Sequence, residues 1–407
     1  MQKIVFLTKR IDEQERKWYN NLVSSRTLVE YKSRGSNMSG LTVDETQILK
    51  EVCALFQIKD EFLDWERINS GHINVTYEVR FQSGKRYIVQ KVNTYVFKNP
   101  VEMMQNIVSV TEFIRKKMQT SGQEVERSVL QYLQTVDGNY YVTLKDGSFW
   151  RCCHFIEKSV SFLKTEDLSV IEEAGKAFGE FQTHLADFPV QDLHIVIPHF
   201  HNTVKRYEAL YEAVNKDEAN RLREVTDILE GYKKLESLAT KPYRLYQEKF
   251  LPLRVTHNDT KTSNVLFDAE TKKRLSVIDL DTVMPGLVAF DFGDAIRISA
   301  STAGEDEKDL SKIALDFDKY QALTRGFVKA LNGRMTEAET STLALGALAM
   351  TAECGARFLT DYLNGDKYFR IHYPDQNLAR AKCHLALAND MVSKLDKMQA
   401  IVDEYCK

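Results

Sequence analysis

The spacing of apolar residues divides the chain into a strand-rich first part and a helical remainder. Residues 65–68, 76–81 and 86–92 are rich in the aromatic and β-branched residues that are typical of β-strands. Residues 83–85, Ser-Gly-Lys, fit a hairpin turn between the last two of these strands. A helical spacing precedes the strands at 43–56. The first part of the chain therefore predicts an antiparallel sheet with a helix before it.

Further along, the pattern adds to the sheet and then becomes helical. Apolar residues with helical spacing at 99–117 predict one helix beside the sheet, and residues 140–144 and 149–156 predict two more strands. From about residue 167 the spacing is helical, except at 254–280, where a loop, a strand, a turn and a strand follow one another. The second part of the chain therefore predicts a helical lobe that carries one small β insertion.

These elements predict an α+β protein with two lobes. Residues 43–156 form the expected N-terminal lobe, and residues 157–407 form the larger, mainly helical C-terminal lobe. Residues 1–42 are polar and show no sustained amphipathic period, so we expect an N-terminal extension that is loosely attached to the folded body.

Composition and charge restrict the possible partners. Hydrophobic residues make up 43% of the chain, and the net charge of −3 gives no reason to expect nucleic acid or an anionic membrane as a partner. The most apolar run, 343–350, is followed by Glu353 and Arg357, which predicts a buried helix and not a membrane span. The apolar run near the N-terminus is too short for a signal peptide, and the six cysteines form no CxxC pair. We expect a cytoplasmic protein and predict no oligomer.

The loop within the β insertion carries the residues that suggest chemistry. It reads VTHNDTKTSNVLFD over 255–268, and it places His257, Asp259, Lys261 and Asn264 just before an apolar strand. A carboxylate at Asp259 can reach a substrate hydroxyl, and Lys261 can neutralise charge on a phosphoryl group. Enzymatic phosphoryl transfer depends largely on such positioning and charge compensation. The loop therefore predicts a phosphotransferase with Asp259 and Lys261 as catalytic residues.

A second carboxylate completes a candidate metal site. Asp279 ends the strand after Asn264, and the hairpin between the two brings both to the same end. Carboxylate and amide oxygens are hard ligands, so Asn264 and Asp279 are expected to hold Mg²⁺. Asp281 shares a strand face with Asp279. It could contact the metal or the substrate, or it could cap the turn that follows.

The loop and the paired acids resemble the protein-kinase-like phosphotransferases, and IDLD in place of DFG resembles their small-molecule branch. Within that branch, the chain resembles bacterial N-acetylhexosamine 1-kinases over most of its predicted folded length. The stretches that carry this resemblance are INSGHINVTY (68–77), VFKNP (96–100), IPHFHNT (197–203), THNDTKTSNVLFD (256–268), VIDLDTVMPG (277–286) and RFLTDYLNGDKYF (357–369). The resemblance implies a bilobal protein-kinase-like fold that transfers phosphate from ATP, with Mg²⁺, to the anomeric hydroxyl of N-acetylglucosamine or N-acetylgalactosamine.

The resemblance also implies where the nucleotide binds. The turn that contains Gly71 and Asn74 matches the family's cover over the phosphates. A cation is expected on the third strand, where Lys91 has the charge but the family pattern aligns Gln90. These two residues point to opposite faces, and the sequence does not choose between them. Adenine is expected against the segment that joins the lobes, near Phe155.

For the sugar, the resemblance points to Arg357 and Tyr368 late in the helical lobe. A buried arginine requires a partner, which could be a sugar oxygen or the carboxylate of Asp361, four residues on. His72 and His201 are further possible sugar contacts, although structural roles are at least as well supported for both.

Two residues near the loop are expected to support it without taking part in the chemistry. Asp291-Phe-Gly293 spells DFG, but it lies at the start of a helical pattern and not at the end of a strand. In related kinases an aspartate at the start of this helix accepts hydrogen bonds from the backbone of the loop, which is the role that the resemblance implies for Asp291. His257 is likewise expected to orient the loop.

Other functions remain possible on the same residues. A kinase of the same fold could act on choline, an aminoglycoside or another small alcohol. A nucleotide-binding regulator that has lost catalysis would be expected to lack Asp259, Asn264 or Asp279, yet all three are present. A P-loop kinase is excluded because the chain has no GxxxxGK[ST] motif.

Overall fold

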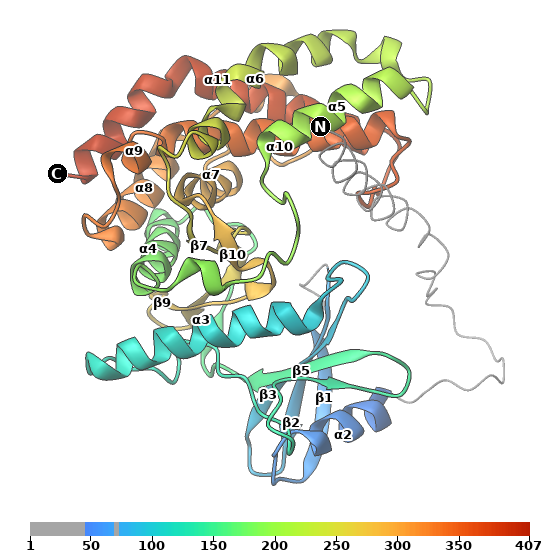
Figure 1. Ribbon diagram of the computed structural model, residues 1–407, viewed down its shortest axis with the longest axis vertical. Helices are drawn as coiled ribbons and strands as arrows, with labels where there is room; N and C mark the ends of the chain where they lie inside the picture. Colours follow the sequence, from blue (N-terminus) through green and yellow to red (C-terminus); the bar gives the residue numbers. More distant parts are fainter. Residues whose placement is uncertain (1–44, 69–72) are drawn as a thin grey trace, which may run out of the picture.

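The computed structural model describes residues 45–68 and 73–407, which form two lobes (Figure 1). The N-terminal lobe is a five-stranded sheet in the order β1-β2-β3-β5-β4, with every neighbouring pair antiparallel. Its elements are α2 (Glu45–Leu55), β1 (Phe62–Ile68), β2 (Val75–Phe81), β3 (Arg86–Val92), α3 (Pro100–Thr120), β4 (Val142–Thr143) and β5 (Phe149–His154).

The two faces of this sheet bury different partners. Because side chains alternate along a strand, Val79, Val89 and Cys152 share one face, where they pack against α2. Val92 and Phe149 lie on the other face and pack with α3. Figure 1 shows α3 between the sheet and the helical lobe, so the second face is the one turned toward the rest of the molecule.

The C-terminal lobe is mainly helical. Its helices are α4 (Leu168–His184), α5 (Thr203–Lys216), α6 (Thr226–Gln247), α7 (Val288–Ser299), α8 (Phe317–Leu331), α9 (Glu337–Thr340), α10 (Leu343–Leu363) and α11 (Gln376–Tyr405). Its strands are β6 (Ser159–Val160), β7 (Arg254–Thr256), β8 (Val265–Asp268), β9 (Arg274–Val277) and β10 (Met284–Gly286). Single 3₁₀ turns lie at Val190–Asp192, Leu222–Glu224, Thr262–Asn264, Leu280–Thr282 and Leu310–Lys312.

Helix α10 forms the centre of this lobe and is buried along almost its whole length. It packs against α5, α6, α7 and α11. A side chain at Gly346 would collide with the backbone oxygen of Ala289, so glycine is what lets α10 approach α7 closely. Because α7 follows the β insertion directly, this tight contact fixes the insertion against the helical core.

The fold agrees with the architecture expected from the sequence, with local differences. The α+β class, the antiparallel N-terminal sheet and the helical C-terminal part are confirmed. The strand expected at 140–144 is reduced to β4, and the β insertion extends beyond 280 because β10 pairs with β7. The extension at 1–42 lies outside the described residues.

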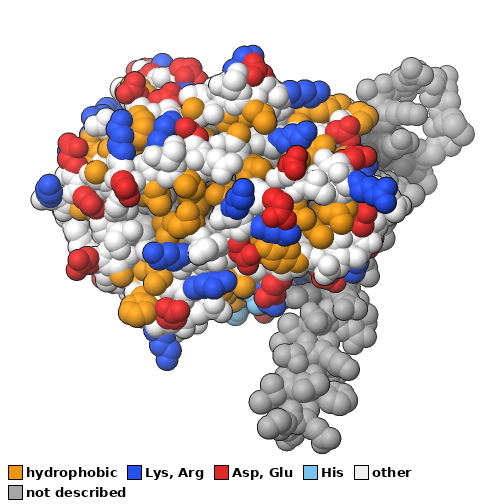
Figure 2. Space-filling model, turned by 90° about the horizontal axis from the view of Figure 1, so that it is seen from above, with side chains coloured by type: hydrophobic (Ala, Val, Ile, Leu, Met, Phe, Trp, Pro, Cys, Tyr) orange, Lys and Arg blue, Asp and Glu red, His pale blue; other side chains and the backbone are white. Residues whose placement is uncertain are grey.

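The described surface carries charges of both signs. On the face in Figure 2, lysine and arginine side chains are interspersed with aspartate and glutamate, as expected for a net charge of −3. Among the described residues, no helix combines the length and apolar character that crossing a membrane would need.

Candidate active site

The loop 257–264 connects β7 to β8, and a carboxylate beneath it holds its backbone in place. Asp291, on the first turn of α7, accepts the backbone N–H of His257 at 2.9 Å and that of Asn258 at 2.7 Å. Gln182 of α4 also donates to this carboxylate, at 2.7 Å. Asn258 has a left-handed backbone with φ of 64°, a conformation that such contacts must maintain. Asp291 therefore braces the loop in the way expected from the sequence.

His257 connects the loop to the neighbouring hairpin. Its Nε2 lies 2.9 Å from the backbone oxygen of Ile278 and donates to it, so Nδ1 accepts the N–H of Asp259 at 3.2 Å. The ring is fully buried and packs edge-on against Phe178 and Phe181. With both nitrogens engaged inside the protein, His257 orients Asp259 and does not face a substrate.

The side chains of Asp259, Lys261 and Asn264 converge on one carboxylate. Lys261 Nζ lies 2.8 Å from Asp259 Oδ2, and Asn264 Nδ2 donates to the same oxygen at 3.0 Å and to the Asp259 carbonyl at 2.9 Å. Burial raises the pKa of Asp259, but Lys261 and the hydrogen bond from Asn264 outweigh it and lower the pKa overall. Asp259 is therefore ionised at neutral pH and able to accept a hydrogen bond from a hydroxyl.

Asp279 lies beside this cluster, as the hairpin predicts. The backbone N–H of Ile278 donates to the Asn264 carbonyl at 2.9 Å, which ties the two candidate metal ligands together, and Lys261 Nζ is 4.0 Å from Asp279 Oδ2. Partial desolvation and the carboxylates of Asp281 and Asp259 raise the pKa of Asp279 to about 6.

The donor atoms here suit Mg²⁺. Three carboxylates lie close enough to repel one another, and a divalent cation would relieve that repulsion. The Asn264 amide nitrogen makes both hydrogen bonds to Asp259, so its amide oxygen is left to act as a ligand. Asp279 is 42% exposed, so an ion from solution can reach it.

Asp281 makes contacts other than the metal or substrate contact and the turn cap that were considered from the sequence. It is buried and lies 2.5 Å from Nη1 of Arg151, which belongs to β5 of the other lobe. Asn74 Nδ2, also from the N-terminal lobe, donates to its second oxygen at 2.6 Å. Asp281 is therefore held in a buried ion pair between the lobes and is neither a cap nor an exposed metal ligand.

Sequence reasoning missed Arg151, although a signal was present. Apart from His154 at its end, the strand FWRCCH is apolar around Arg151, and an arginine inside such a strand needs a buried partner. The nearest residues in sequence offer none, which indicates a partner elsewhere in the fold.

The strand pairing places Gln90 and Lys91 on opposite faces of the sheet. Gln90 is paired with Arg151 across β3 and β5, accepts its Nε at 2.9 Å and donates to Thr76 Oγ1 at 3.0 Å. Lys91 lies on the opposite face, 5.8 Å from the ring centre of Trp150. Alternation along the strand points Lys91 toward α2 and Gln90 toward α3, and which of the two meets the phosphates stays a prediction. Arg151 lies with Gln90 on the inner face, which is the face turned toward α3.

The remaining residues predicted to bind the nucleotide or the sugar lie partly inside and partly outside the described residues. Gly71 and His72 lie outside the described residues. Asn74 accepts the backbone N–H of Asn93 at 2.9 Å while it donates to Asp281. Phe155 lies in the segment between the lobes, with the guanidinium of Arg86 stacked 3.9 Å from its ring centre.

Arg357 and Tyr368 are brought together in the helical lobe. The guanidinium of Arg357 lies 5.9 Å from the ring centre of Tyr368 and 5.4 Å from that of Phe369. The alternative partner, Asp361, instead accepts the backbone N–H groups of Tyr368 at 2.7 Å and Phe369 at 2.9 Å. Asp361 thus shapes the segment that carries Tyr368, and Arg357 is held over the rings.

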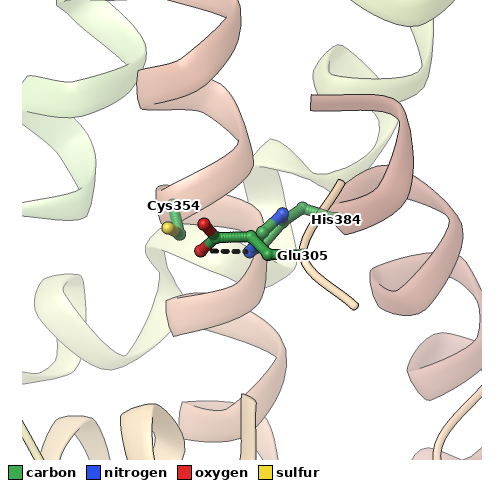
Figure 3. A group of neighbouring side chains, drawn as sticks. All are labelled: Glu305, Cys354 and His384. Carbon is green, nitrogen blue, oxygen red and sulfur yellow. Dashed lines mark ion pairs between the residues drawn. The ribbon is translucent and has the colours of Figure 1, made fainter. Parts of the chain in front are cut away.

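One further group of possible metal ligands lies near Arg357. Glu305, Cys354 and His384 have ligand atoms within 4.8 Å of one another, and Figure 3 shows them pointing toward a common centre. Arg297 Nη1 lies 3.5 Å from Glu305 and 3.4 Å from His384 Nε2, where a cation would have to bind. Burial also raises the pKa of Cys354 to about 11, so its thiol stays protonated. The group does not suit a metal ion.

With this geometry established, comparison with known proteins identifies the family. The model of the phosphotransferase enzyme family matches residues 64–323, well over half of the chain. The chain belongs to this family. The match runs from β1 into α8 and includes the loop 257–264 and Asp279.

Solved structures agree with the family at the level of the fold. An aminoglycoside phosphotransferase from Alicyclobacillus acidocaldarius has a TM-score of 0.56 at 13% identity, covering 91% of this chain and 99% of that one. A spectinomycin phosphotransferase in complex with ADP and spectinomycin has a TM-score of 0.53 at 14% identity, covering 86% and 98%. A choline kinase from Cryptosporidium parvum has a TM-score of 0.52 at 14% identity, covering 89% and 99%. These structures therefore share the two-lobed fold of this chain over most of its length.

Proposed function

We propose that this phosphotransferase transfers the γ-phosphoryl group of ATP to the anomeric hydroxyl of an N-acetylhexosamine. The observation that carries the proposal is the convergence of Lys261 and Asn264 on the carboxylate of Asp259, next to Asp279. This arrangement provides an ionised acceptor for a hydroxyl proton and a cation beside it. The sugar is supported by the sequence stretches that resemble N-acetylhexosamine 1-kinases.

In the proposed mechanism, Asp259 binds the acceptor hydroxyl, orients it toward the γ-phosphorus and accepts its proton as the new P–O bond forms. Lys261 offsets the charge on the phosphoryl group and keeps Asp259 ionised. Asn264 and Asp279 would hold Mg²⁺, which neutralises charge on the nucleotide phosphates when it is bound. The products are the sugar 1-phosphate and ADP.

The N-terminal lobe would hold the nucleotide. Gly71 and Asn74 belong to the turn proposed to cover the phosphates, and the segment with Phe155 would lie against adenine. Gln90 keeps its place in this proposal as the residue that aligns Arg151 on the inner face. The proposal that ATP is the phosphate donor is supported by the related spectinomycin phosphotransferase, which was solved with ADP.

Arg357 and Tyr368 are the residues proposed to bind the acceptor. The neighbouring Arg297 and Arg380 are each paired with a carboxylate, Glu305, at 3.5 Å, so their charges are compensated within the protein. A sugar with hydroxyl groups and an acetamide carbonyl offers Arg357 and Tyr368 uncharged hydrogen-bonding partners.

The test is ADP release from ATP and Mg²⁺ with a panel of acceptors: both N-acetylhexosamines, glucose, galactose, choline and kanamycin. Asp259→Asn supplies the background rate. Activity confined to the acetylated sugars supports the proposal and shows which one is preferred. Activity on choline or kanamycin would overturn the substrate while keeping the reaction type. Nucleotide binding without transfer to any acceptor would favour a regulator.

A further inference from the structure

His201 lies just before α5 and contacts the loop 257–264 at Asn258. Its Nε2 lies 2.9 Å from the backbone oxygen of Asn258, and its Nδ1 lies 3.0 Å from Oε1 of Glu353 on α10. A backbone carbonyl and an ionised carboxylate can only accept hydrogen bonds. Both ring nitrogens must therefore carry protons for both contacts to form, which makes His201 an imidazolium.

The surroundings support a charged His201 despite its burial. The side chain of His201 is 9% exposed and that of Glu353 is 1% exposed. Burial lowers the pKa of His201, but the charge of Glu353 and the two hydrogen bonds outweigh it and raise the pKa overall. Asp294 of α7 adds a further favourable charge, and the rings of Phe200 and Phe290 also pack against the imidazole.

Glu353 depends on this pairing in turn. Burial raises its pKa, but the positive charges of His201, Arg206 and Arg357 lower it overall. Its second oxygen, Oε2, is buried and makes no hydrogen bond to a described residue. The carboxylate is therefore kept ionised by charges around it, and His201 contacts it directly at 3.0 Å.

The position of His201 gives this pair a consequence for Asp259. The peptide group that His201 contacts joins Asn258 to Asp259. Asp291 holds the N–H side of Asn258, and His201 holds its C=O side. Without His201, the described contact that remains on this peptide is the 3.2 Å hydrogen bond from the Asp259 N–H to His257. Because Asn258 has a left-handed φ of 64°, we expect the peptide then to shift and displace the Asp259 carboxylate.

We propose that His201 and Glu353 form a buried ion pair that positions Asp259, and that loss of the His201 proton sets the alkaline limit of phosphoryl transfer. His201 is a positioning residue, since it acts through the backbone of the loop. When its proton leaves, one nitrogen presents a lone pair to an oxygen, and the contact becomes repulsive. His201 acts on the loop and would position Asp259 in the same way for any acceptor hydroxyl.

Two amide variants separate the two contacts. In His201→Gln the longer side chain places its amide near the position of Nε2, so it can still donate to Asn258 but cannot titrate. In His201→Asn the same group reaches only the position of Nδ1, near Glu353. We expect kcat to fall roughly 10- to 100-fold in His201→Asn and much less in His201→Gln, with ATP KM changed less than about threefold in both.

The pH profile and nuclear magnetic resonance give readouts that a purely structural role would not change. In His201→Gln the rate should no longer fall at alkaline pH, and in Glu353→Gln the fall should begin at lower pH. In the wild type, ¹⁵N-labelled His201, assigned by its absence in His201→Gln, should show two protonated nitrogens above the ordinary histidine pKa of about 6.5. Thermal melting and ADP binding identify variants that fail to fold.

Three results would overturn the inference: equal kcat in the folded Gln and Asn variants, an unchanged alkaline limb in His201→Gln, or a singly protonated His201 spectrum at neutral pH. The spectrum requires no acceptor. A failed acceptor panel would therefore count against the proposed substrate, whereas a neutral His201 would count against the ion pair.

Discussion

Replacing Arg151 by methionine should destabilise the protein far more than the loss of a surface charge. The side chains of Arg151 and Asp281 are 2% and 4% exposed, and the charged atoms are 2.5 Å apart. Methionine replaces the aliphatic part of the arginine side chain with an apolar one near Met104, which Arg151 already contacts. The substitution therefore removes the charge and leaves the Asp281 carboxylate buried without its cation.

The size of the effect follows from this burial. Removing one partner of a buried ion pair typically costs about 3–5 kcal/mol, because the remaining charge is left uncompensated. Removing both partners together is often nearly neutral when the replacements fill the space. We therefore expect Arg151→Met to lower the free energy of unfolding by about 3–5 kcal/mol, and Arg151→Met with Asp281→Leu to recover at least about 2 kcal/mol of that loss.

Urea unfolding of the two single variants and the double variant measures this coupling. Arg115→Met is the matched control, because Arg115 on α3 pairs with Glu112 where both side chains are about one-third exposed. That control should cost less than about 1 kcal/mol. A loss below about 1 kcal/mol in Arg151→Met, or single-variant losses that simply add in the double variant, would refute the reasoning.

Three further predictions concern the chemistry. Asp259→Asn should lower kcat by at least ~10³-fold while ADP affinity, measured by calorimetry, changes less than about threefold; a variant with near-normal kcat would contradict the proposed role. Because the pKa of Asp279 is raised to about 6, protons should compete with the metal below that pH. The Mg²⁺ concentration that gives half of the maximal rate should therefore rise about tenfold for each pH unit below 6. A Mg²⁺ requirement that does not change with pH would count against Asp279 as a ligand. Arg357→Met should raise the acceptor KM at least ~10-fold and leave the ATP KM within about threefold. Lys91→Met, on the outer face of the sheet, should change neither KM. Steady-state kinetics in which Lys91→Met raises a KM and Arg357→Met does not would contradict both expectations.

Local sequence patterns were sufficient to predict most of the fold. The strand expected at 86–92 has the same bounds as β3, and one face of that strand is buried against α2 while the other meets α3. The spacing of His257, Asp259, Lys261 and Asn264 also led to the right cluster, since all four lie on one short loop. Patterns of this kind are local, so a single sequence reveals them.

The features that were missed depend on contacts between distant segments. Arg151 could not be matched to Asp281 because the pair forms only when the two lobes meet. The short strand β10 contains Pro285, which disfavours a strand, yet it pairs with β7 at the edge of a two-stranded sheet. The contact of His201 with Asn258 likewise requires α5, α10 and the loop to be assembled. None of these pairings leaves a periodic signal in the sequence.

The most direct test of the central claim is phosphorus nuclear magnetic resonance of the product formed from ATP, Mg²⁺ and each N-acetylhexosamine. We predict a new sugar phosphate whose phosphorus couples to the anomeric proton, formed by the wild type and absent with Asp259→Asn. Phosphate attached at any other carbon, or ADP formed with no sugar phosphate, would contradict the proposed reaction.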